Sequence, residues 1–496
     1  MASPLDRIPL SGAVTLCGAV LLAAPLAQSG YFPGFDLPFH AVAVAAGRGD
    51  MLFTEHAGYG WSYLTMYGLA GALHAVGLGA AMALQVVIAL YVLGFVWGAA
   101  RLLRAFDAHP ALALCAAPAA YSVVLSYGFL PFALGYPIAF ALWAYVRERH
   151  VIGVGVCALL LAITHPLAAG FGAVGGAALL AAGWDRDQGK RIATVAAVMA
   201  IGLIPAVVAV LQLPADQSLP PLLRDASLWE RWWAPDRPAL AASVGEAASR
   251  LFHVAPAGAR AYVIALLLGC AAAMLAIGGR RERRGLAAEV LLGVLVVAYF
   301  ASPYTLDAPY VIAIQPRLLP MIWVVGLVAL RVDREARRPR AVLIPPVVGA
   351  MVAAAAVAVA MTRFSRLAEE FEVVTARSDD GVKTLVLVEH DPVADDAPPS
   401  PWRSFGGHLM AEHGGYVSHA FFAGARWLPI VRADGASPPR APPLGRPHEF
   451  DWDRHADGWD QFLIRDIPPD HDWFGEHRGD VELVLGASKW SLYRRR

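Results

Sequence analysis

Long apolar stretches separated by short polar segments make up most of the chain before position 363. Ionisable residues are almost missing inside these stretches and gather at their ends. A stretch of about 20 apolar residues has the length of a helix that crosses a bilayer. The pattern therefore predicts a polytopic membrane protein, mainly α in fold class, built as a bundle of transmembrane helices.

Basic residues at the ends of the apolar stretches predict which ends face the cytoplasm. Where two successive basic clusters lie on the same side, the chain between them has to turn back, and we expect such turns at 127–131 and at 164–166. The count gives about eleven crossings, with the N-terminus inside and the C-terminus outside. The arginines placed on the cytoplasmic side are Arg101, Arg149, Arg191, Arg280 and Arg338.

The composition changes after Thr362 to charged residues, Pro-rich breaks and short β-branched runs. This change predicts two domains: a transmembrane helical domain at 1–363, with outer loops at 29–60 and 212–260, and an extracytoplasmic α/β domain at 364–496. In the second domain the apolar runs and Gly or Pro breaks predict strands at 384–388, 461–465, 481–485 and 489–493, and a helix at 402–413 closed by two glycines.

The overall composition excludes several functional classes. The chain is 57% hydrophobic and 16% charged with a mean hydropathy of +0.50, whereas soluble domains carry about 25% charged residues. A net charge of zero and the lack of a basic face argue against a nucleic-acid partner. No phosphate-binding loop, nucleophile elbow or His-Glu-x-x-His motif is present. The C-terminal histidines lack zinc-site spacing and are expected to be solvated: His408, His413, His448, His455, His471 and His477.

The segment 34–40, directly after the first apolar stretch, places an acid and an imidazole four residues apart, as Asp36 and His40. Pro38 suits the first turn of a helix, where its missing N–H costs nothing. Asp36 precedes that turn, where a carboxylate can accept hydrogen bonds from the first backbone N–H groups. The segment is therefore either a capped helix start or a catalytic or binding acid at the membrane surface.

Further polar side chains gather at the outer ends of the predicted spans. Arg317 opens a span at its outer end, where the positive-inside rule gives no reason for a cation. Its guanidinium either snorkels to water or forms a fork onto a phosphate group. A site at this boundary suits a substrate with a polar head and a lipid tail. The other candidate substrate-binding residues are Arg260, Glu55, His56, His165, Asp307 and Gln315.

These features together resemble the GT-C superfamily of integral-membrane glycosyltransferases, which use polyprenyl-phosphate-linked sugars. The shared features are an N-terminal span, an acid in the first outer loop, many crossings and a soluble outer C-terminal domain. The segment 35–40 is also similar to an Asp-x-Pro-x-His pattern in the first loop of other bacterial multi-spanning proteins. Many GT-C members carry an acidic pair in this loop, whereas here Leu37 follows Asp36.

The resemblance implies transfer of a sugar from a polyprenyl-phosphate donor to an envelope acceptor outside the membrane. Asp36 is then the base that takes the acceptor proton, and His40 orients it or helps to bind a divalent metal ion. Arg317, or second Arg260, neutralises the departing lipid phosphate. Membrane lipid and the lipid-linked sugar are the expected partners, and protein partners stay unknown. Two other functions also fit: a non-catalytic membrane protein that binds envelope glycan or a partner through its C-terminal domain, and a lipid or solute carrier.

Overall fold

The structure is a computed structural model that describes most of the chain. It describes the following residues: 10–28, 30–46, 53–55, 63–183, 188–211, 247, 249–253, 257–280, 286–302, 305–307, 310–312, 314–333, 339–389, 401–418, 430–432, 439–443, 446–465 and 472–496. The predicted cytoplasmic Arg338, like His56 and His471, lies outside these residues.

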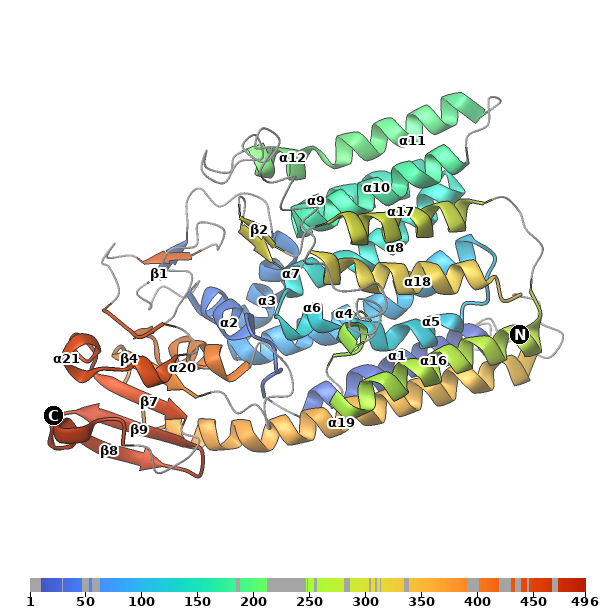
Figure 1. The fold of residues 1–496 in the computed structure, drawn as a ribbon. Coiled ribbons are helices and arrows are strands. Elements are labelled where there is room, and N and C mark those ends of the chain that lie inside the picture. The colour runs from blue at the N-terminus through green and yellow to red at the C-terminus, as the bar shows by residue number, and fades with distance from the viewer. Residues whose placement is uncertain are drawn as a thin grey trace.

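Figure 1 shows a bundle of roughly parallel helices with a small mixed domain at one end. The N-terminal end of helix α1 lies at the far end of the bundle from this domain. The longest helices are α4 (Ala80–Ala105), α16 (Ala257–Gly278) and α19 (Pro339–Thr375). The shorter helices of the bundle are α1 (Leu10–Ala23), α2 (Leu37–Ala46), α3 (Leu64–Ala75), α5 (Leu112–Ala116), α6 (Val123–Ser126), α7 (Leu130–Ala133), α8 (Gly135–Glu148), α9 (Val151–Thr164), α10 (Pro166–Ala182), α11 (Gly189–Gly202), α12 (Ile204–Leu211), α17 (Ala287–Ala301) and α18 (Leu319–Leu330).

Three of the described helices, α4, α16 and α19, are long and apolar enough to cross a membrane. Most of the other apolar helices in the bundle have 10–17 residues, which is short for a crossing. The expected mainly helical membrane architecture is confirmed, whereas the count of about eleven crossings stays a prediction.

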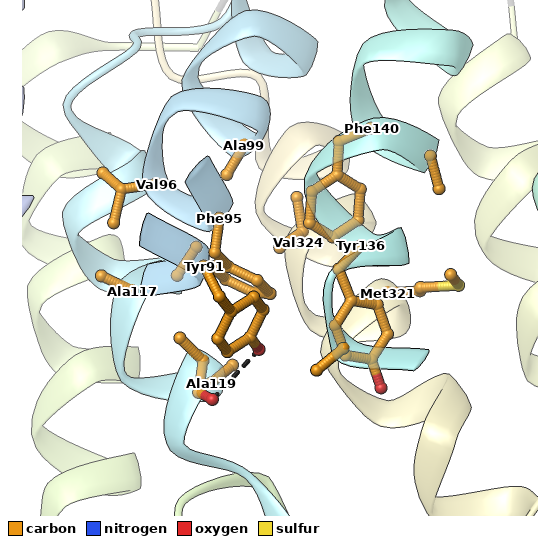
Figure 2. Close-up of a cluster of buried hydrophobic side chains, with 14 of the residues drawn as sticks. Tyr91, Phe95, Val96, Ala99, Ala117, Ala119, Tyr136, Phe140, Met321 and Val324 are labelled. Atoms are coloured by element: carbon orange, nitrogen blue, oxygen red, sulfur yellow. Dashed lines mark hydrogen bonds between the residues drawn. The ribbon is translucent and has the colours of Figure 1, made fainter. Parts of the chain in front are cut away.

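Aromatic side chains fill the centre of the bundle, where α4, α8 and α18 meet (Figure 2). The ring of Phe95 on α4 lies 6.0 Å from that of Tyr136 and 5.4 Å from that of Phe140, both on α8, centroid to centroid. The Tyr91 hydroxyl donates to the Ala120 carbonyl, which gives this buried phenol a partner inside the core. The packing fixes α8 against α4, and α8 leads into the candidate site.

The C-terminal domain is built on a five-stranded mixed sheet in the order β5-β4-β7-β9-β8. Strand β4 runs parallel to β5 and β7, and β9 runs antiparallel to β7 and β8. The sheet strands are β4 (Lys383–Val388), β5 (Tyr416–Val417), β7 (Gln461–Arg465), β8 (Val481–Gly486) and β9 (Trp490–Arg495). Helices α20 (Gly406–His413) and α21 (Trp452–His455) complete the described part.

Two short antiparallel strand pairs lie near this end of the bundle (Figure 1). Strand β1 (Phe53–Glu55), between α2 and α3, pairs with β6 (Ile430–Arg432) of the C-terminal domain. Strands β2 (Thr305–Asp307) and β3 (Tyr310–Ile312) form a hairpin just before Arg317. The segment between α2 and α3 is thus joined to the C-terminal domain through backbone hydrogen bonds.

Helix α2 is shared between two hydrophobic cores. Its residues Leu37, Ala41 and Val44 pack into the core of the bundle. Phe39 and Val42 pack into the core of the C-terminal domain. A helix that is apolar on all sides is expected to be covered all round, and here two different bodies cover it.

The local sequence predictions hold at several points. The chain breaks between α6 and α7 at 127–129 and between α9 and α10 at His165, as expected. The strands predicted at 384–388, 461–465, 481–485 and 489–493 correspond to β4, β7, β8 and β9. The prediction that the C-terminal histidines are solvated is wrong for His408 and His455, which are buried.

Candidate functional site

The first turn of α2 is held in place by the turn between α6 and α7. The backbone N–H of Phe35 donates to the Ser126 carbonyl and that of Asp36 to the Tyr127 carbonyl, at 2.9 and 3.0 Å. Gly128 has a positive φ of 81°, and an ideal Cβ on it would lie only 2.5 Å from the Asp36 nitrogen. Only glycine fits this close approach of two backbones. The contact fixes where the Asp36 side chain leaves the chain.

Asp36 is a half-buried residue beside the 127–129 turn. Burial raises the pKa of Asp36 from 3.8 to about 7, and the positive charge of Arg317 opposes part of this shift. Among the residues that the structure describes, no hydrogen bond reaches this carboxylate. It is therefore not occupied as a helix cap, and its pKa is poised for proton transfer near neutral pH.

Arg317 lies in the 3-10 turn η6 (Gln315–Leu318) at the start of α18 and is 5% exposed. Its guanidinium carbon lies 4.1 Å from the ring centroid of Phe129 and 5.0 Å from that of Phe132. The Tyr136 hydroxyl donates to the Arg317 carbonyl at 2.8 Å. Cation–π contact and a buried backbone anchor therefore hold this side chain beside Asp36, on whose pKa its charge acts.

His165 lies between α9 and α10, with its ring 5.0 Å from that of Tyr63 and 5.2 Å from that of Phe132. Its Nδ1 accepts a hydrogen bond from the Leu167 N–H, so the neutral ring carries its proton on Nε2. Burial and the nearby charge of Arg317 hold the pKa of His165 well below its ordinary value. His165 is therefore a neutral hydrogen-bond donor.

The His40 side chain, in the first turn of α2, contacts groups from two other segments. Its Nδ1 lies 2.8 Å from the Tyr67 hydroxyl on α3. Burial lowers the pKa of His40 to about 4, and a hydrogen bond to the Gly128 backbone acts in the opposite direction. Both sides of the ring thus contact protein groups that also line the site. The arrangement suits a side chain that fixes α2, α3 and the 127–129 turn relative to one another.

The other predicted site residues are placed differently. Gln315 donates through Nε2 to the Ser302 carbonyl at 2.8 Å, which ties η6 to the end of α17. Arg260 is buried on α16, where its charge acts on His253 rather than on Asp36. Glu55 and Asp307 lie in strands β1 and β2, at the same end of the bundle as Asp36.

Three tyrosines belong to the site although the sequence did not single them out. Tyr63 and Tyr67 lie at the start of α3 and interact electrostatically with Asp36, and Tyr136 interacts with Arg317. Burial, the largest cause, raises the pKa of Tyr63, so its phenol stays neutral. Aromatic residues inside apolar stretches usually indicate a membrane interface, which hides such a role. The sequence pattern therefore gave no signal for these three tyrosines.

Among the described residues, no group of three or more His, Cys, Asp or Glu side chains is arranged to hold a metal ion. The titratable side chains that converge here are instead one acid, one guanidinium, two neutral imidazoles and three neutral phenols. Such a set can take a proton, bind one anionic group and donate hydrogen bonds to hydroxyl or phosphate oxygens.

No family model matches the sequence, and no curated protein matches it either. A solved structure does match over the whole length: the crystal structure of ArnT from Cupriavidus metallidurans in the apo state. The TM-score is 0.52 at 10% sequence identity, over 99% of this chain and 98% of that chain. ArnT is a GT-C glycosyltransferase. At this identity the likeness concerns the fold alone, and the chain therefore has an ArnT-like fold, in agreement with the fold class that its sequence predicts.

Proposed function

We propose that this protein is a membrane glycosyltransferase that moves a sugar from a polyprenyl-phosphate donor to an envelope acceptor on the outer side of the inner membrane. The observation that carries the proposal is the convergence of Asp36, Arg317 and His165 at one end of a GT-C fold. A partly exposed acid with a pKa of about 7 beside a buried guanidinium is the pair that such a transfer needs.

In the proposed reaction the acceptor hydroxyl oxygen attacks the anomeric carbon of the sugar. Asp36 takes the hydroxyl proton as the new carbon–oxygen bond forms. The bond between the anomeric carbon and the phosphate oxygen breaks, and the bonding electrons leave with the lipid phosphate. The products are the glycosylated acceptor, the polyprenyl phosphate and a protonated Asp36, which returns its proton to water.

Arg317 is proposed to bind the phosphate, whose negative charge grows as the bond breaks. A guanidinium can form two parallel hydrogen bonds to phosphate oxygens, and in a buried site this interaction is stronger than in water. Its packing against Phe129 and Phe132 fixes the plane of the fork before the substrate arrives. The donor lipid then lies along the apolar outside of the bundle.

His165 is proposed to donate from Nε2 to a sugar hydroxyl or a phosphate oxygen, because Nδ1 is already an acceptor. His40 is proposed as a positioning residue that keeps α2 in register with α3 through Tyr67. Glu55, His56, Asp307 and Gln315 are proposed to line the approach to the site from the outer loops. Arg260 is proposed to contact the lipid away from the reacting centre.

The decisive test compares Asp36→Asn with the wild-type protein in lipid vesicles, using a panel of radiolabelled polyprenyl-phosphate sugars. Loss of a general base costs roughly 100- to 10,000-fold in rate, whereas Asn keeps the shape of Asp. We therefore expect normal yield, normal binding of polyprenyl phosphate and a transfer rate lower by that factor. Asp457→Asn, at a carboxylate that is 97% exposed on the C-terminal domain, serves as the matched control.

The same assay gives the pH dependence. Asp36 acts as a base only when it has lost its proton, so the rate should rise with pH to a plateau with a midpoint near 7. Full activity of Asp36→Asn would contradict the proposal. Binding of polyprenyl phosphate without turnover of any donor would favour a binder instead, and lipid flux across the vesicle would favour a carrier.

A further inference from the structure

Helix α20 of the C-terminal domain lies directly against α2. Gly407 on α20 faces Pro38, and an ideal Cβ on Gly407 would lie 2.9 Å from the Pro38 carbonyl carbon. Contacts this short are essentially never made by a real Cβ, and the neighbour here is backbone, which gives way less easily than a flexible side chain. Gly407 is therefore a point of close helix–helix approach. The residue it contacts, Pro38, follows Asp36 by two positions in the sequence.

The first turn of α2 is thus held between two glycines from different parts of the molecule. Gly128 lies against the Asp36 backbone on the bundle side, and Gly407 lies against the Pro38 backbone on the domain side. Each approach brings backbone against backbone, so the turn is packed closely against both the bundle and the C-terminal domain. The position of the Asp36 carboxylate is consequently set by the C-terminal domain as much as by the bundle.

A second contact closes the same junction. The hydroxyl of Tyr31, five residues before Asp36, donates to Oε1 of Glu412 on α20 at 2.7 Å. The ring of His408, also on α20, lies 4.4 Å from the Tyr31 ring. Burial lowers the pKa of His408 to about 3, so this ring stays neutral and packs as an aromatic group. Beyond α2 along the chain, strand β1 pairs with β6 of the C-terminal domain.

We infer that the C-terminal domain positions the acid of the site, with Gly407 and the Tyr31–Glu412 pair as its positioning residues. The inference rests on the proposed function for its catalytic consequence. The docking itself stands on the contacts alone. A domain that only recognised an acceptor would not need to pack against the backbone of the turn that carries Asp36.

The test uses Gly407→Ala in the full-length protein, with Gly479→Ala as control. A Cβ on Gly479, in the same domain, meets nothing within 4 Å. The first readout is hydrogen exchange of the peptide covering 36–46, and we expect faster exchange there in Gly407→Ala only. The second is kinetics: a misplacement of about 1 Å costs on the order of 100-fold in rate, so kcat should fall steeply while KM for the donor and polyprenyl phosphate binding stay unchanged.

Tyr31→Phe and Glu412→Gln keep the shape of the junction and lose or weaken its hydrogen bond, so both should show the same split between kcat and KM to a smaller degree. The inference is overturned if α2 exchanges faster in Gly407→Ala while kcat is unchanged, or if α2 exchange does not respond. If wild type transfers no sugar but α2 exchange responds, the proposed function fails and the docking stands.

Discussion

Helix α18 carries an arginine at each end, and the two guanidinium groups have different surroundings. Arg331, just after the helix, forms an ion pair with Glu289 of α17. At the same end of the bundle Arg101 pairs with Glu148, and Arg149 donates to the Gly183 carbonyl. At the other end Arg317 rests on aromatic rings beside an acid that no hydrogen bond reaches among the described residues. At the first end the charges are matched by carboxylates and a carbonyl, whereas at the other end the guanidinium packs on aromatic rings and its charge acts on the pKa of Asp36.

The comparison implies that the two ends face different compartments, which is the largest effect to test. Alkaline phosphatase needs disulfides and is active only outside the cytoplasm. A fusion after Arg496 should be active and a fusion after Arg284 inactive, because the latter follows a basic cluster. A silent C-terminal fusion in a protein that is otherwise made and inserted would overturn the predicted orientation.

The next largest effect separates the two arginines of α18. Loss of one preorganised donor costs roughly 100- to 1,000-fold in kcat, and since Lys keeps the charge we expect about 100-fold for Arg317→Lys. Arg331→Lys should leave the transfer rate unchanged. Binding of polyprenyl phosphate, followed by native mass spectrometry, should weaken in Arg317→Lys alone. Equal binding in both variants would show that Arg317 only snorkels.

The smallest effect concerns stability and has opposite signs at the two ends. Because folding raises the pKa of Asp36 from 3.8 to about 7, the folded state loses stability as pH rises through this window. Asp36→Asn should therefore unfold at a higher temperature than wild type at pH 8 and at a similar one at pH 4. Glu148→Gln breaks a partly exposed pair and should lower stability at pH 8 by about 0.2–1 kcal/mol. A stability loss in both variants would contradict the comparison.

Local chemistry made some of this predictable from sequence. Pro166 marks the start of α10 and leaves His165 at the turn, and Gly414 and Gly415 end α20 where expected. The sequence singles out Asp36, Arg317 and His165 because a polar or charged side chain at the end of an apolar stretch is costly to bury and often marks a functional site.

Other features could not be read from the chain. The glycines Gly128 and Gly407 matter because of backbones that approach from elsewhere in the sequence. Helix α2 is apolar on every face, so its pattern predicts burial but not which of its residues face the bundle and which face the domain. A histidine ring has two nitrogens that usually bind water or a polar group, so the sequence favours exposure of His408. In the structure its ring instead packs against the rings of Tyr31 and Phe405.

Helix α19 connects the two regions without a break, from Pro339 in the bundle to Thr375. Phe364, Ala368 and Phe371 on its last turns belong to the core of the C-terminal domain. A helix rises about 1.5 Å and turns about 100° per residue, so α19 sets both the distance and the rotational phase of the C-terminal domain relative to the bundle. One residue inserted after Met361 would turn α20 away from α2 while leaving every side chain of either region intact. The number of residues along α19 therefore determines which face of the C-terminal domain meets the helix that follows Asp36.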